Sequence, residues 1–172
     1  PTVGKIVMKG ASEQLASVTL ELGGKSPTII DDSANLEKAV KKILFGKFTN
    51  AGQTCIAPDY VFLKNDLKEE FIRLFKEYLK AFYSENAEDS NSYGRIVNQK
   101  HFERLTSYLD EAKVNGSDIA LGGRVNSNEN YIEPTLVFDV PDDSKLMQEE
   151  IFGPILPVKL YTDIEEAVAY IN

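Results

Sequence analysis

The sequence has one cysteine, one histidine and no tryptophan. With Cys55 alone, an internal disulfide is excluded, and so is a zinc or iron–sulfur site built from cysteines. His101 and the scattered carboxylates form no compact group with metal-ligand spacing, so we expect no protein-bound metal. A reducing compartment, the cytoplasm, agrees best with this cysteine usage.

Long apolar runs and an excess of positive charge are also missing. No stretch approaches the ~20 apolar residues of a membrane helix, and residues 1–10 lack the charged-then-apolar pattern of a secretory signal. There are 19 basic and 27 acidic residues, and the net charge of -8 repels nucleic acid and anionic lipid. We therefore expect no nucleic acid partner and no membrane segment in this chain.

The remaining composition is that of a folded globular domain, with 42% apolar and 27% charged residues in a chain of 172. Apolar residues at helical spacing predict helices over residues 5–16, 36–48, 67–83 and 98–114. Short apolar runs predict strands over residues 18–22, 28–30, 60–63, 119–121, 131–138 and 155–160. This alternation predicts an α/β fold, a three-layer α/β/α sandwich with a largely parallel sheet.

Two polar segments carry helix-start signals. Asp31, Asp32 and Ser33 supply capping oxygens ahead of the helix predicted over residues 36–48. Residues 162–165 resemble a capping box and predict a final helix after them. Residues 122–130 are rich in turn formers and predict a loop.

Cys55 is the first candidate for chemistry. It follows a small polar segment that contains Gly52 and precedes Pro58, which places it at or near a loop. An unpaired cysteine is more often an inert buried residue than a nucleophile. A glycine-bearing loop, however, exposes backbone N–H groups that can stabilise a thiolate and later an oxyanion, which thiol chemistry on a carbonyl requires.

Glu21 is the second candidate. It lies in an apolar, strand-like segment directly before Gly23 and Gly24. Partial burial would raise the pKa of its carboxyl group and suit it to general-base work near neutral pH. The alternative is a glutamate on the polar face of a half-exposed strand, because apolar and polar residues alternate over residues 18–22.

Three segments, in order, resemble signature segments of the aldehyde dehydrogenase superfamily. They are LELGGKSP at residues 20–27, NAGQTC at residues 50–55 and EEIFGP at residues 149–154. Cys55 follows Glu21 by 34 positions, as the nucleophile follows the base in that family. The continuation IAPDY at residues 56–60 resembles the class 3, fatty-aldehyde-like branch, and the similarity extends over essentially the whole chain.

The resemblance implies that residues 1–172 form the cysteine-bearing catalytic domain, without most of the dinucleotide-binding domain and without the C-terminal oligomerisation segment. It implies that Cys55 is the nucleophile and that Glu21 is the base that activates water. Cys55 would attack an aldehyde to form a thiohemiacetal, hydride would pass to NAD or NADP, and the thioester would be hydrolysed to a carboxylic acid.

The resemblance also implies cofactor contacts. Glu150 would contact the ribose on the nicotinamide side, and Phe152 would pack beside the nicotinamide. Gly23 would lie where the backbone approaches that ring. Val3 and Gly4 resemble the end of the segment that starts the helix facing the pyrophosphate.

The resemblance further implies a homo-oligomer in the parent enzyme, and we expect this part alone to be inactive as a dehydrogenase. Two other functions compete with the dehydrogenase. One is a cofactor-independent thiol esterase in which His101 activates Cys55, although its charged neighbours favour a solvated surface histidine. The other is a non-catalytic oligomerisation module, and the presence of Cys55, Glu21 and Glu150 argues against it.

Overall fold

The structure, a computed structural model, describes residues 2–172, and Pro1 lies outside the described residues. A five-stranded sheet with the order β1-β2-β7-β6-β3 forms its centre. All neighbouring strands are parallel except β3, which runs antiparallel to β6. The strands are β1 (Pro27–Ile30), β2 (Tyr60–Lys64), β7 (Ile155–Tyr161), β6 (Thr135–Phe138) and β3 (Asp118–Leu121). The prediction of a largely parallel sheet is confirmed.

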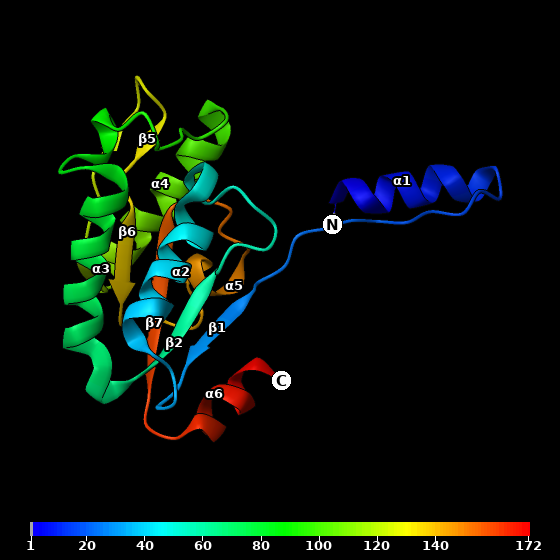
Figure 1. Cartoon of the computed structure of the whole chain (residues 1–172). Helices are drawn as coiled ribbons and strands as arrows, with labels where there is room; N and C mark the ends of the chain where they lie inside the picture. Colours follow the sequence, from blue (N-terminus) through cyan, green and yellow to red (C-terminus); the bar gives the residue numbers. More distant parts are fainter. Residues whose placement is uncertain (1) are drawn as a thin grey trace.

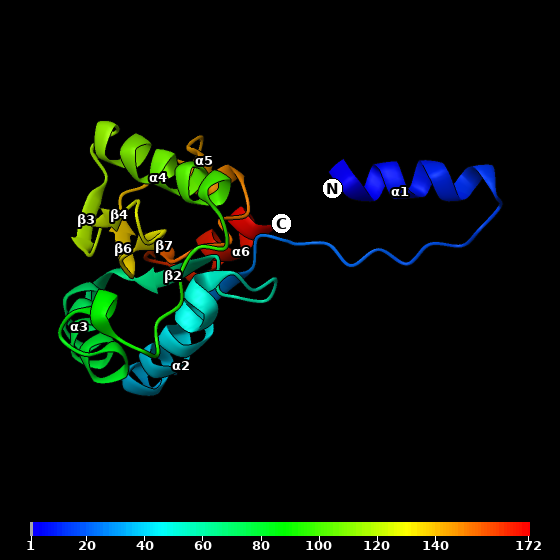
Figure 2. The same cartoon turned by 90° about the horizontal axis from the view of Figure 1, so that it is seen from above.

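Helices cover both faces of this sheet, as Figure 2 shows. On one face lie α2 (Leu36–Phe48) and α3 (Lys68–Tyr83); on the other lie α4 (Gln99–Val114), α5 (Lys145–Gln148) and α6 (Ile164–Ile171). Strand β2 shows why both layers are needed, because its residues are buried on either side. Tyr60 and Phe62 meet Tyr170 of α6, while the alternate residues Val61 and Leu63 point to the opposite face. The predicted three-layer sandwich is therefore confirmed.

Several local predictions need correction. The strand predicted over residues 131–138 is divided into β5 (Tyr131–Ile132) and β6 at Pro134, whose ring nitrogen has no hydrogen to donate to a ladder. β5 pairs with β4 (Val125–Asn126), a strand within the predicted loop. Short 3-10 helices, which the sequence pattern did not predict, occur at η1 (Thr49–Gly52), η2 (Asn65–Leu67) and η3 (Ala87–Asp89).

Of the two helix-start predictions, the capping residues of α2 were wrong and the start of the final helix is confirmed. Asn35, not Asp31, Asp32 or Ser33, caps α2, because its side chain accepts the Lys38 N–H. Asp31 instead accepts hydrogen bonds from Ser33 N and Oγ, and these bonds lower the pKa of the Asp31 carboxyl group. α6 begins where a final helix was predicted, with Asp163 as its cap.

The first 26 residues include a helix that stands away from the sandwich. α1 (Thr2–Glu13) and the extended residues 16–26 project from the body in both views (Figures 1 and 2). The predicted strand over residues 18–22 is wrong, because the segment has no sheet partner within residues 2–172. Leu20 and Leu22 instead lie against Gly4 of α1, within 3.3 Å of where its Cβ would be. No helix in residues 2–172 has the length and apolar character that crossing a membrane requires.

Candidate active site

The topology brings the three signature segments to one edge of the sheet. Residues 20–26 lead into β1, residues 50–59 lead into β2, and residues 149–154 lead into β7. Because β1, β2 and β7 are parallel neighbours, the segments before them meet at the same edge, formed by the amino ends of the strands. Segments far apart in the sequence therefore lead into the sheet at the same edge.

The loop before Cys55 has an unusual backbone. Asn50, Ala51 and Gly52 have φ values of 54°, 52° and 76°, all in the left-handed region. For Ala51 this conformation costs roughly 1–2 kcal/mol, and such strain clusters at functional sites. The loop ends in a turn at Cys55, which is a free, exposed thiol.

Gln53 fixes this loop through both ends of its amide. Its Nε2 donates to Asn50 O at 2.9 Å and to Arg95 O at 3.0 Å. Its Oε1 accepts the Val97 N–H at 2.9 Å. The backbone two residues before Cys55 is thus tied to the segment that precedes α4.

Two glycines let the loop pack against residues 149–154. A Cβ on Gly52 would lie 2.3 Å from Gly153 O, and a Cβ on Gly153 would lie 2.5 Å from a methyl carbon of Leu105. Neither position has room for a side chain. The Cys55 loop therefore lies directly on the segment that carries Glu150 and Phe152.

A cavity of about 650 Å³ opens beside this contact. Gly23, Glu150 and Phe152, all predicted cofactor contacts, line it together. A Cβ on Gly23 would lie 1.8 Å from Glu150 Oε2, so the missing side chain makes the space that the carboxylate occupies. In the described part of the chain, the Glu150 carboxylate has no hydrogen-bond donor, which leaves its oxygens free for the hydroxyl groups of a ligand. The remaining lining residues are Gly24, Lys25, His101, Arg104, Gln148 and Glu149.

Four predicted residues lie outside this cavity. Val3 and Gly4 belong to α1, and Val3 is 71% exposed. Glu21 is exposed on the extended segment, so of the two alternatives for its environment partial burial is not the one found. Cys55 lies on the same edge of the sheet, but it shares no hydrogen bond with Glu21 among the described residues.

The helix α4, which carries none of the signature segments, supplies two of the lining residues. His101 and Arg104 come from the first turns of α4, one helical turn apart. Arg104 donates to Ile151 O at 2.7 Å and to Glu150 O at 3.5 Å, so it holds the backbone beside the cavity. Only the spacing of two cationic or titratable residues on one helix face could have indicated them, and that pattern is common on solvated helices.

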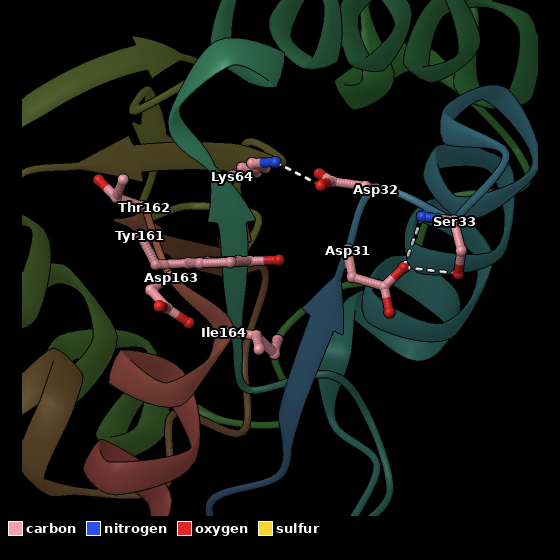
Figure 3. Close-up of a pocket in the computed structure, with 8 residues that line it drawn as sticks. All are labelled: Asp31, Asp32, Ser33, Lys64, Tyr161, Thr162, Asp163 and Ile164. Atoms are coloured by element: carbon pink, nitrogen blue, oxygen red, sulfur yellow. Dashed lines mark hydrogen bonds and ion pairs between the residues drawn. The ribbon is translucent and has the colours of Figure 1, made fainter.

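A second cavity, of about 410 Å³, lies at the opposite edge of the sheet (Figure 3). Residues at or just after the carboxyl ends of β1, β2 and β7 form it, and none of the predicted site residues lines it. Lys64 forms an ion pair with Asp32 there, and Asp31 accepts a hydrogen bond from the Ser33 N–H (Figure 3). Within residues 2–172 no three His, Cys, Asp or Glu side chains are grouped to hold a metal ion.

Comparison with known proteins identifies the family. The aldehyde dehydrogenase family model matches residues 1–172. The 4,4'-diaponeurosporen-aldehyde dehydrogenase of Staphylococcus aureus is 53% identical over 99% of the chain and 36% of its own length. A dimeric, NADP-preferring aldehyde dehydrogenase of Rattus norvegicus is 45% identical over 99% and 36%. Aldehyde dehydrogenase family 3 member A2 of Mus musculus is 48% identical over 99% and 34%. The expected likeness to the class 3 branch is confirmed, and the chain spans about a third of these relatives.

Solved structures agree. A substrate-bound aldehyde dehydrogenase of Staphylococcus aureus superimposes with a TM-score of 0.93 at 52% identity, over 99% of this chain and 36% of that one. Betaine aldehyde dehydrogenase from the same organism, in complex with NAD+, gives 0.85 at 32% identity, over 99% and 35%. The fold, the three signature segments and both comparisons lead to one conclusion, that this chain belongs to the aldehyde dehydrogenase family.

Proposed function

We propose that this chain is the cysteine-bearing catalytic part of an enzyme that oxidises an aldehyde to a carboxylic acid with NAD or NADP. The observation that carries the proposal is the packing of the Cys55 loop against the segment of Glu150 and Phe152, through Gly52 and Gly153. This packing joins an exposed thiol to the wall of a ligand-sized cavity. The named activities of the relatives support the same reaction.

The cavity has the features that a nicotinamide cofactor requires. Phe152 offers an apolar surface for a flat ring, and Gly23 leaves the space in which the Glu150 carboxylate lies at the cavity wall. The free Glu150 carboxylate would accept hydrogen bonds from the ribose hydroxyls. When bound, the cofactor supplies the hydride acceptor.

The residues of the chain would perform the other steps. The Cys55 thiolate forms a bond to the aldehyde carbon, and backbone N–H groups of the loop stabilise the resulting oxyanion. Loss of hydride leaves a thioester on Cys55. Glu21 takes a proton from water, the hydroxide attacks the thioester, and the C–S bond breaks to release the acid and the thiolate. Glu21 precedes Gly23 by two residues on the segment that enters β1. This nearness to a cavity-lining residue is how Glu21 would reach the thioester.

Two further properties belong to this proposal. A nucleophilic thiol must remain reduced, which agrees with a cytoplasmic enzyme. The exposed apolar residues of α1, including Val3 and Ile6, agree with a homo-oligomeric parent enzyme or with contacts to further domains. This part alone would be inactive as a dehydrogenase, because Val3 and Gly4 lie away from the cavity.

An activated aryl ester tests the thiol without cofactor. We expect a burst of leaving group from the chain, lost in Cys55→Ser, because acylation of Cys55 precedes deacylation. Glu21→Gln should keep the burst and slow the turnover that follows it, because only deacylation needs the base. A burst that survives in Cys55→Ser would contradict the proposal.

A further inference from the structure

Asp59 is a buried carboxylate directly before β2, four residues after Cys55. Its Oδ1 accepts the Ile151 N–H at 3.1 Å, and its backbone N–H donates to Ser26 O at 2.9 Å. One residue therefore binds the segments that precede β1 and β7 to the strand that follows the Cys55 loop. Asp59 therefore contacts both signature segments, the one at residues 20–27 and the one at residues 149–154.

Lys25 completes the connection from the other side. Its Nζ lies 2.6 Å from Asp59 Oδ2 and donates to Leu146 O at 2.7 Å and Glu149 O at 3.0 Å. These three acceptors match the three hydrogens of an ammonium group, so its hydrogen-bonding capacity is used within the chain. The exposed fractions of the Lys25 and Asp59 side chains are 20% and 5%, and an ion pair this buried is less screened by solvent than a surface pair.

Lys25 and Asp59 bind the backbone on the two sides of Glu150, with Lys25 bonded to residues that precede it. Leu146 belongs to α5 and Glu149 directly precedes Glu150. Asp59 then holds Ile151, on the other side of Glu150. The Glu150 backbone is thus fixed at both neighbours by one ion pair, while its side chain remains free to face Gly23.

We propose that the Lys25–Asp59 ion pair is a positioning element for the cofactor side of the site. The pair fixes the positions of the Glu150 carboxylate and Phe152 relative to Gly23. The charged groups of Lys25 and Asp59 are themselves bonded within the chain. The inference deepens the proposed function and rests on it for its effect on cofactor binding. Its structural part stands on the contacts alone.

Hydrogen exchange tests the structural part. In Lys25→Met, Asp59 keeps Lys47 as a neighbouring cation at 3.9 Å, so the buried carboxylate is not left without a positive partner. We expect the amides of residues 147–151 to exchange about ten- to a hundredfold faster than in the native chain, as expected for loss of a charge-assisted hydrogen bond. Core amides of α3 should be unchanged.

Lys64→Met is the matched control, because it removes a Lys–Asp pair at the opposite edge of the sheet. It should leave exchange at residues 147–151 unchanged. Lys25→Arg, which restores the positive charge, should recover part of the protection. Unchanged exchange in Lys25→Met, or equal acceleration in Lys64→Met, would overturn the positioning role.

The functional consequence is measured in the complete enzyme. We expect Lys25→Met to raise the KM for the cofactor about tenfold, with a smaller change in kcat and with the cofactor-free ester burst at Cys55 retained. A general loss of folding would instead lower kcat and the burst together and leave the cofactor KM of the remaining folded enzyme unchanged. An unchanged cofactor KM would refute the inference even if Cys55 forms its acyl adduct, whereas absence of the burst in the native protein would refute the proposed function and leave the exchange result standing.

Discussion

The Glu150 carboxylate fills the space in which a side chain on Gly23 would lie. A Cβ on Gly23 would lie 1.8 Å from Glu150 Oε2 and 2.4 Å from its carboxyl carbon. The two residues come from different signature segments, 127 positions apart in the sequence. Their contact explains why the first segment needs a glycine at a position whose φ is not in the left-handed region.

Gly23→Ala should therefore displace the Glu150 carboxylate without unfolding the chain, because the far end of a flexible side chain can rotate away. We expect the cofactor KM of the complete enzyme to rise about tenfold, while the free energy of unfolding changes by less than about 1 kcal/mol. Gly10→Ala, where no atom lies within 4 Å of the added Cβ, is the control. An unchanged cofactor KM in Gly23→Ala would show that Glu150 does not contact the cofactor.

Gly52→Ala should act on stability instead. Its Cβ would lie 2.3 Å from Gly153 O, a backbone atom that cannot rotate away, and its φ is +76°. We expect a loss of about 3 kcal/mol in the free energy of unfolding, measured with urea. Gly116→Ala has the same kind of backbone, φ +77°, but its Cβ meets nothing within 4 Å, so it should lose only about 1 kcal/mol. Equal losses at both positions would mean that the contact of the two loops is not rigid.

Lys47 should make stability depend on pH. Its Nζ is fully buried without a hydrogen-bond partner in the described residues, and burial lowers its pKa to about 8. Asp59 and Glu150 oppose this shift, while Lys25 adds to it. Below pH 8 both folded and unfolded chains carry the proton, so the full cost of burying the charge is present. Between about pH 8 and 10.5 the folded chain loses the proton first, and the free energy of unfolding contributed by this group rises.

Lys47→Met removes the buried charge and keeps a side chain of similar length. We expect it to be more stable than the native chain at pH 7, by roughly 3 kcal/mol at most, with the difference shrinking towards pH 10. Comparing the two proteins cancels the effect of the buried tyrosines Tyr93 and Tyr131, whose pKa values burial raises. A difference that stays constant from pH 7 to 10 would contradict the account of Lys47.

The sequence predicted the elements that packing enforces. The apolar stripe of α3 places Phe71, Leu74 and Phe75 in the core, and the runs that became β2 and β7 are buried in the sheet centre. Such patterns depend only on neighbours along one element. The three-layer fold followed from their alternation.

The incorrect or missing predictions concern residues whose conformation or partners depend on tertiary contacts. Residues 18–22 have the alternation of a strand, but no strand in the described part of the chain pairs with them, so they remain extended and Glu21 is exposed. The contacts of Asp59 with Ile151 and Lys25 join segments 92 and 34 positions apart, and no local pattern predicts which partner a lone aspartate finds. His101 is exposed, as its charged neighbours predicted, but no local pattern indicated that it would line a cavity together with Arg104.

The central claim is that Cys55 carries the acyl group, and mass spectrometry tests it most directly. The complete Glu21→Gln enzyme, mixed with an aldehyde and NAD or NADP and stopped in acid, should retain the acyl group of that aldehyde as a thioester. The peptide that contains Cys55 should gain the mass of the acyl group less one hydrogen, and Cys55→Ser should show no such gain. Reduced cofactor formed at a normal rate in Cys55→Ser, with no adduct on Cys55 in Glu21→Gln, would contradict the account.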